Sequence, residues 1–170
     1  MVDGLAGPIL DSLKAHPYLA ILAASLAPGI EPRYAVLLGV SIEGVSLTAS
    51  LAISLAGLVI LSSIMSLGVS AIDSYMEKAL NTGSRLYRVA RLYRRVKLSG
   101  YKRAKASVEK WGLLGLILFI AIPLPFTGIY TGALASIPLG IRGYRLFAAL
   151  LVGGFISLAS TTLALALARF

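Results

Sequence analysis

Two charged residues interrupt the first long apolar stretch of the chain, and their side chains are the best suited to chemistry inside a membrane. Glu31 and Arg33 lie in the segment APGIEPRY, within a stretch from residue 17 to 42 that has no other charge. A charge at the centre of a bilayer is costly, so such residues usually face a cavity or a partner. A carboxylate there suits proton carriage, and a guanidinium binds phosphate-like anions bidentately. We identify both as candidate substrate- or ion-binding residues, the alternative being an ion pair that only neutralises itself.

A polar counterpart lies in the second interrupted apolar stretch, from residue 111 to 141. Its segment IPLPFTG contains Thr127 and Gly128, which offer a hydroxyl group and close backbone access. In both stretches, the helix after the interruption would direct its unsatisfied N–H groups and positive dipole end at the bilayer middle. Two such termini and one arginine would favour an anion. Thr127 and Gly128 therefore join the candidate site, with a capping role as the alternative for Thr127.

Other kinds of chemistry find no support in the composition. The chain has no cysteine and one histidine, so disulfides, thiolate nucleophiles and histidine-rich metal or haem sites are excluded. It has no Gly-x-Ser-x-Gly motif, no His-Glu-x-x-His motif and no aspartate pair within an apolar run. We expect a protein that is not an enzyme and that needs neither a cofactor nor a metal.

The elements that position these residues are those of an integral membrane protein. Of the 170 residues, 58% are hydrophobic and 14% charged, against roughly 25% charged in a soluble domain. Residues 45–72 and 146–168 are uncharged and exceed the roughly 20 residues needed to cross the hydrocarbon core. Both runs are predicted to be transmembrane helices. Both also carry small residues at four-residue spacing, which lets helices approach closely: Ser46, Ser50 and Ser54 in the first, and Ala149, Gly153, Ser157 and Thr161 in the second.

Prolines and glycines break the two remaining apolar stretches near their middles. A proline inside a helix removes a hydrogen bond and clashes with the preceding turn. The helical pieces on either side would be ~15–20 Å long, about half the bilayer. We therefore predict two re-entrant hairpins, with four full spans as the alternative that charge counting does not exclude. The breaking residues are Pro28, Gly29 and Pro32 in the first hairpin, and Pro123 and Pro125 in the second.

A strongly basic segment joins the two halves. Residues 77–110 contain 11 bases and 2 acids, and 11 − 2 = +9 is the whole net charge of the chain. The positive-inside rule places this loop in the cytoplasm. We expect an amphipathic helix that breaks at Ser99-Gly100 and lies on acidic lipid headgroups, in preference to a nucleic-acid-binding arm. The residues expected to contact acidic lipid are Arg85, Arg88, Arg91 and Arg95.

The predicted fold is an all-α integral membrane protein of the cell membrane. It is an inverted repeat of a re-entrant helical hairpin plus a transmembrane helix, joined by the basic amphipathic cytoplasmic helical loop. Two spans are too few to shield two hairpins from lipid, so we expect a homo-oligomer. The single membrane domain, 1–170, divides into a surface segment 1–16, a hairpin 17–42, a span 45–72, a loop 73–110, a hairpin 111–141 and a span 146–168.

The motifs around both breaks resemble those of a known family. The segments APGIEPRYAVLLG and VEKWGLLGLILFIAIPLPFTGIYTGALAS, with the basic loop between them, resemble the small multidrug export family from about residue 17 to 170. The pattern is also similar, at greater distance, to the DedA and VTT-domain membrane proteins, which implies opposed re-entrant hairpins and movement of lipid-linked phosphates. Glu31 matches the acidic position of their first hairpin. Their second hairpin has an arginine shortly before its proline, whereas this chain has Ile120, Ala121 and Ile122.

Three functions remain open at this point. The first is a transporter or flippase for an anionic or amphiphilic lipid-like substrate, with or without proton coupling, and with a midplane site between the two hairpin tips. The second is an exporter of small hydrophobic cations, as the family resemblance implies. The third is a membrane scaffold that transports nothing.

Overall fold

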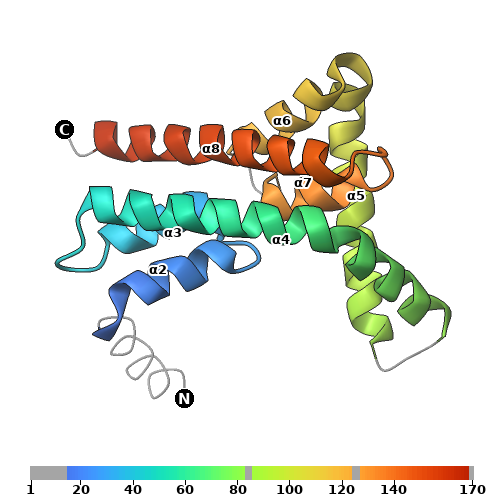
Figure 1. Cartoon of the computed structure of the whole chain (residues 1–170), viewed down its shortest axis with the longest axis horizontal. Helices are drawn as coiled ribbons and strands as arrows, with labels where there is room; N and C mark the ends of the chain where they lie inside the picture. Colours follow the sequence, from blue (N-terminus) through green and yellow to red (C-terminus); the bar gives the residue numbers. More distant parts are fainter. Residues whose placement is uncertain (1–14, 83–85, 124–126, 169–170) are drawn as a thin grey trace. The chain divides into compact units, whose positions relative to one another are not determined.

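All the regular secondary structure in the described part of the chain is helical. The computed structural model describes residues 15–82, 86–123 and 127–168, and no strand occurs among them. Arg85, Pro125 and nearly all of the expected surface segment 1–16 lie outside this part. The helices (Figure 1) are α2 (Pro17–Leu26), α3 (Glu31–Val40), α4 (Leu47–Asn81), α5 (Tyr87–Trp111), α6 (Leu113–Ala121), α7 (Ile129–Ser136) and α8 (Gly143–Ala168).

Two of these helices, α4 and α8, are long and apolar enough to cross a membrane. Their positions agree with the two predicted spans, and the all-helical membrane class is therefore supported. The chain divides into two compact units, one formed by residues 1–60 with 158–170 and the other by residues 61–157. Each unit contains one of the two interrupted stretches, and each is described by itself.

In the first unit, α2 and α3 form a tight helical hairpin. Pro28 forces the residue before it out of the helical region, and Ala27 is extended at φ −80 and ψ 133. Gly29 follows with a φ of +92, which favours glycine. The chain doubles back here, so that Ile21 of α2 packs against Ala35 of α3 in one buried cluster. A single kinked span would not bring these two residues together.

Small residues bring this hairpin against the first half of α4. A Cβ at Gly57 of α4 would collide with Ser25 of α2, and a Cβ at Gly39 of α3 would collide with Ser50 of α4. The Ser50 hydroxyl also donates a hydrogen bond of 3.0 Å to the carbonyl of Val36. The predicted serine stripe on α4 therefore serves packing from Ser50 onward.

The first serine of that stripe has a different role. Ser46 is exposed and precedes α4, and its hydroxyl oxygen accepts a hydrogen bond from the Ala49 amide at 3.1 Å. This is the geometry of a helix N-cap. At its other end, α4 continues to Asn81, nine residues beyond the predicted end of the span at residue 72, since no glycine or proline intervenes.

In the second unit, α5 is one continuous helix, so the predicted break at Ser99-Gly100 is wrong. Gly100 instead allows close packing, because a Cβ there would lie 3.1 Å from the carbonyl oxygen of Thr131 on α7. The chain reverses at Gly112, which has a φ of +57. Helix α6 then folds back onto α5, with Gly115 directly against the backbone of Ser107.

The second interrupted stretch contains two helices too short to cross a bilayer. Helix α6 has 9 residues and α7 has 8. Ile122 is extended before Pro123, for the same steric reason as at Ala27. A Cβ at Gly132 of α7 would lie 2.6 Å from Ile120 of α6, and a Cβ at Gly153 of α8 would lie 2.8 Å from the same residue. The small-residue stripe of α8 therefore lets α6 approach closely.

Candidate functional site

The residues at the start of α3 form a buried ion pair. A guanidinium nitrogen, Nη2 of Arg33, lies 3.8 Å from Oε2 of Glu31, and both side chains are less than one-tenth exposed. Among the described residues, these two are the only charged side chains that are buried. The guanidinium carbon of Arg33 also lies 4.8 Å from the ring centroid of Tyr34, a cation–π distance.

A strained backbone makes this pairing possible. Side chains two positions apart on a regular helix point in different directions and do not meet. Glu31 has a φ of +59, a left-handed conformation that is uncommon for any residue other than glycine. Its amide still bonds the carbonyl of Ala27 at 3.3 Å, so the turn is hydrogen-bonded as well as strained. Such outliers persist where the surrounding structure enforces them, and they concentrate at functional sites.

The second break has polar groups but no charge. The Thr127 hydroxyl donates a hydrogen bond of 2.7 Å to the carbonyl of Ile122, at the end of α6. The carbonyl of Gly128 accepts two hydrogen bonds, from the Gly132 amide at 2.8 Å and from the Thr131 hydroxyl at 3.3 Å. Thr127 thus ties the two ends of the break together, and the N-cap residue of α7 is Gly128.

The structure groups the candidate residues in two sets. Glu31 and Arg33 lie together in the first unit, with Pro28 and Gly29 just before them and Pro32 buried in the first turn of α3. Thr127 and Gly128 lie in the second unit, after the exposed Pro123. A single site uniting both sets remains a prediction. Among the described residues, no three His, Asp or Glu side chains gather as metal ligands would.

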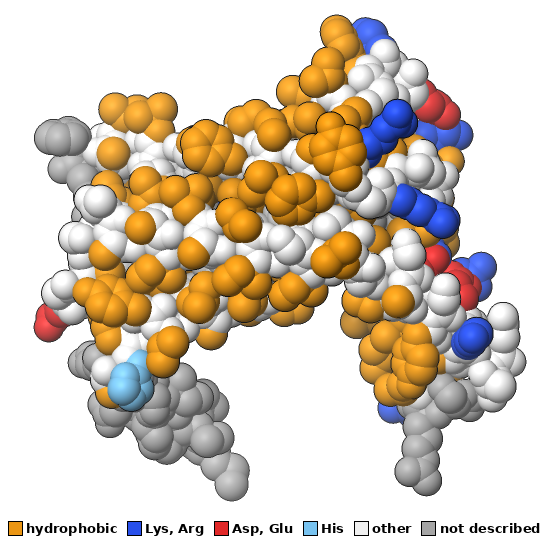
Figure 2. Space-filling view, in the orientation of Figure 1, with side chains coloured by type: hydrophobic (Ala, Val, Ile, Leu, Met, Phe, Trp, Pro, Cys, Tyr) orange, Lys and Arg blue, Asp and Glu red, His pale blue; other side chains and the backbone are white. Residues whose placement is uncertain are grey.

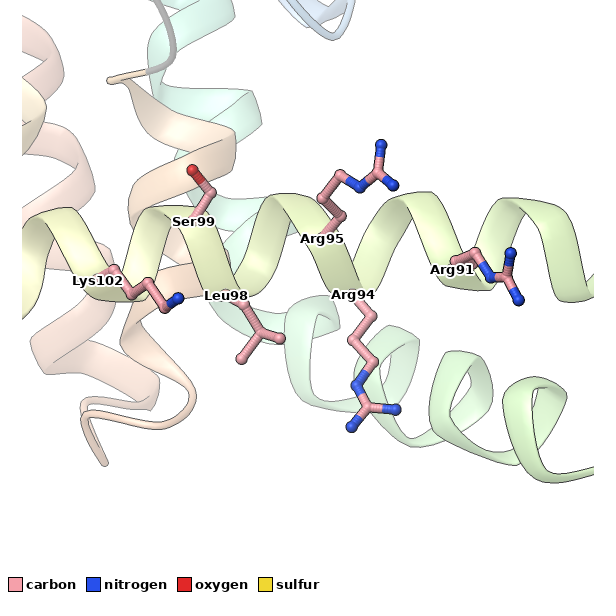
Figure 3. A pocket seen from close by; sticks show the side chains of 6 residues that line it. All are labelled: Arg91, Arg94, Arg95, Leu98, Ser99 and Lys102. Atoms are coloured by element: carbon pink, nitrogen blue, oxygen red, sulfur yellow. The ribbon is translucent and has the colours of Figure 1, made fainter.

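The predicted lipid-contacting arginines lie on the exposed side of α5. Arg88, Arg91 and Arg95 are exposed, and Nη2 of Arg91 donates a hydrogen bond of 2.7 Å to the Tyr87 hydroxyl. A shallow hollow of about 470 Å³ lies along this side of the helix. Figure 3 shows that the side chains around it spread apart and do not converge on one point. Its lining residues are Arg91, Arg94, Arg95, Leu98, Ser99 and Lys102.

Sequence reasoning missed a polar clamp between α4 and α5. Nζ of Lys97 lies 2.5 Å from the Asp73 carboxylate and 2.9 Å from that of Glu77, and the Tyr93 hydroxyl donates to Asp73 at 3.0 Å. Burial disfavours the charge on Lys97, but hydrogen bonds to the two carboxylates outweigh it and raise the pKa of Lys97. Burial and the hydrogen bond to Asp73 raise the pKa of Tyr93 well above its usual value. The sequence indicates this clamp through two pairs of polar residues that lie four positions apart, Asp73 with Glu77 and Tyr93 with Lys97.

Comparison with known families identifies the chain over most of its length. Residues 31–159 match the family described as "Putative small multi-drug export protein". The chain belongs to this family. The matched region begins at Glu31, just after Pro28 and Gly29, and includes the Glu31–Arg33 pair, the second break, the clamp and the basic face of α5. The comparisons with curated proteins and with solved structures gave no match.

Proposed function

We propose that this member of the small multidrug export family is a membrane transporter for small amphiphilic solutes that carry an anionic group. The observation that carries this proposal is the Glu31–Arg33 pair. Its members are the only charged side chains buried in the described chain, they lie 3.8 Å apart, and a strained turn holds them at the start of α3. We take this pair as the binding and coupling site.

The pair suggests how a proton and an anion would move together. With Glu31 ionised, the two charges cancel and the site has no net charge to attract a solute. Protonation of Glu31 leaves the guanidinium of Arg33 positive and buried, a state that is costly without a counter-ion. An anion then replaces the carboxylate, because guanidinium binds carboxylate and phosphate oxygens bidentately. Loss of the proton restores the internal pair and releases the anion.

The first turn of α3 supports the same preference. Its N-terminal N–H groups and positive dipole end favour anions near Glu31 and Arg33. A cationic solute would have to compete with Arg33 for Glu31 and would be repelled by the guanidinium. The geometry therefore favours an anionic group, and a phosphate-bearing lipid or another amphiphile fits this chemistry.

Export of small hydrophobic cations is the second candidate function. The description of the family favours it, and Glu31 is the one buried acid among the described residues. In that case Glu31 binds the cation directly, and Arg33 is the residue displaced. A scaffold that transports nothing is the third candidate, in which the pair only holds the first turn of α3.

We further propose that both interrupted stretches are re-entrant hairpins in an inverted repeat, with α5 in the cytoplasm and two or more copies in the assembly. The folding back of α2 onto α3 supports hairpins over full spans. Because the chain has no cysteine, single cysteines at positions 43 and 142 can be labelled from each side of sealed vesicles. The inverted repeat requires them on opposite sides, and labelling from one side contradicts it.

The proposed function is tested in proteoliposomes with anionic amphiphiles, cationic dyes and an imposed proton gradient. We expect Glu31→Gln to bind the anion and to lose its response to the gradient. We expect Arg33→Lys, which keeps the charge and loses the planar fork, to impair anion transport. The matched controls are Glu43→Gln and Arg142→Lys, since both of these residues are exposed. Loss of cation transport in Glu31→Gln, with Arg33→Lys unaffected, selects the second candidate, and unchanged transport in both variants selects the scaffold.

A further inference from the structure

The end of α4 and the start of α5 form a two-helix arm. Residues 72–81 and 87–97 make up this arm, and Lys97 joins its helices through the carboxylates of Asp73 and Glu77 at 2.5 and 2.9 Å. Tyr93 adds a third contact, to Asp73 at 3.0 Å. The arm continues directly from α4, one of the two helices able to cross a membrane. It therefore lies where a membrane-crossing helix ends.

The innermost face of α5 is occupied by the protein itself. Ala90, Gly100 and Ala104 are buried, and Gly100 packs against α7. The buried small residues of α5 therefore contact the protein and cannot contact lipid. Any lipid contact must use the sides of α5 that remain exposed.

One exposed side of α5 combines apolar and basic residues. Val89 is 51% exposed and Leu92 is 60% exposed, and both lie in the arm. Arg88 precedes Leu92 by four residues and Arg95 follows it by three, so both arginines are its neighbours on the helix surface. Figure 2 shows both hydrophobic and basic side chains at the surface of the arm.

The hollow borders this side of α5, and Arg95 lies at their common edge. Leu98 is 44% exposed and lines the hollow with Arg91, Arg94, Arg95 and Lys102. These basic side chains spread apart (Figure 3), and one of them, Arg91, already bonds Tyr87 at 2.7 Å. No apolar neighbour comparable to the pair of Val89 and Leu92 accompanies them in the lining of the hollow.

We infer that the arm rests on the acidic surface of the bilayer through the side that contains Leu92. Val89 and Leu92 enter the boundary between headgroups and acyl chains, and Arg88 and Arg95 bind the lipid phosphates. Arginine reaches such phosphates readily, because its long apolar stem lies along the hydrocarbon while its charged end stays in the headgroup layer. Arg95 then lies at the edge of the hollow nearest the lipid, whereas Arg91, Arg94 and Leu98 face water, which revises the expectation that Arg91 contacts lipid.

The bilayer is the partner that charge and connectivity favour. A second copy of the chain offers little acidic surface, because four of its seven acids are already paired with bases. These pairs are Glu31 with Arg33, Asp73 and Glu77 with Lys97, and Glu109 with Lys105. An acidic soluble partner would find the basic residues but would leave Val89 and Leu92 in water. A lipid surface satisfies both groups at once.

The test uses two leucines of one helix as a matched pair. The full-length protein, which has no native cysteine, is prepared as Leu92→Cys and as Leu98→Cys, labelled with a nitroxide and reconstituted in nanodiscs that contain phosphatidylglycerol. Accessibility to oxygen and to a water-soluble nickel complex is then measured by electron paramagnetic resonance. We expect the label at 92 to favour oxygen and the label at 98 to favour the nickel complex.

Charge variants identify the arginines that hold the arm on the membrane. In the Leu92→Cys background, Arg88→Gln with Arg95→Gln should weaken lipid contact by up to about fivefold for each arginine. Arg91→Gln with Arg94→Gln removes the same charge and should leave the contact unchanged. Nanodiscs of pure phosphatidylcholine should reduce the contact of the unsubstituted arm. Equal aqueous exposure at 92 and 98, or equal effects of the two charge variants, would overturn the inference.

Discussion

The two helix breaks of this protein look alike in sequence and differ in chemistry. Both contain an extended residue before a proline, and both precede a short helix. At the first break, Glu31 is strained and its carboxylate faces a buried guanidinium. At the second break, the Thr127 hydroxyl bonds Ile122, and the described residues carry no charge. Only the first break can change its net charge with one proton, whereas the second is held by neutral hydrogen bonds.

The largest expected effect distinguishes the two members of the charged pair. Removing one partner from a buried ion pair typically costs 3–5 kcal/mol, about what we expect for Glu31→Leu. Arg33→Leu should cost less, because the remaining Glu31 can become neutral by taking up a proton, whereas arginine stays charged. Thermal unfolding of the two purified variants in one detergent measures the difference. Equal losses of stability in the two variants, or a larger loss for Arg33→Leu, would contradict this account.

The double variant sharpens the same comparison. Glu31→Leu with Arg33→Leu removes both charges and leaves no buried ion, so it should be more stable than Glu31→Leu alone. A double loss equal to the sum of the single losses would mean that the two side chains act independently, and the 3.8 Å contact would then contribute nothing.

Local sterics made much of this fold predictable from sequence. The residue before a proline avoids the helical region, and the sequence therefore located both breaks. The two long uncharged runs predicted α4 and α8, because each is long enough to cross the hydrocarbon core. The continuity of α5 was not predictable, because glycine at position 100 suits both a helix break and a close helix contact. Only the presence of α7 against Gly100 decides between them.

The candidate site was predictable in its residues but not in its geometry. A charge within an apolar stretch points to Glu31 and Arg33 without further knowledge. Their direct pairing depends on the left-handed conformation of Glu31, which no local pattern requires. The clamp was missed because counting charge over the loop treats Asp73, Glu77 and Lys97 as solvated residues. A search for i, i+4 polar pairs on neighbouring helices would have found them.

The next largest effect on stability is expected for substitutions in the turn of the first break. Gly29 has a φ of +92 and no atom within 4 Å of an added Cβ, so substitution there changes the backbone energy alone. We expect Gly29→Ala to cost about 1–2 kcal/mol, the usual penalty for a left-handed alanine. Gly29→Asn is the control, because asparagine adopts this conformation more readily and should cost less. Unfolding midpoints equal to wild type in both variants would show that this turn relaxes freely.

The hydrogen bond across the second break should contribute less to stability than the charged pair does. Thr127→Val keeps the shape of the side chain and loses the bond to Ile122, for an expected cost of about 1 kcal/mol. Thr127→Ser retains the hydroxyl and should remain closer to wild type. If Thr127→Val instead abolishes transport at unchanged stability, the hydroxyl acts on the substrate, and the second break has a chemical role after all.

The smallest effect concerns the clamp, whose charges lie beyond the predicted span 45–72 and contrast with the buried pair. For both Lys97 and Tyr93 the folded-state pKa is raised above its ordinary value, 10.5 for lysine and 10.0 for tyrosine, so the folded protein holds these protons more tightly than the unfolded chain. Their contribution to stability is therefore fully present below about pH 10 and declines as the pH rises through the folded-state values.

We expect the unfolding temperature of the wild type to fall between pH 10 and 11.5 more steeply than that of Tyr93→Phe with Lys97→Met, which lacks both groups. Lys105→Met, at the half-exposed pair with Glu109, controls for the loss of one positive charge. Parallel pH profiles for the wild type and the double variant would show that Asp73 and Glu77 do not hold these protons, and other contacts would then have to join the two helices of the arm.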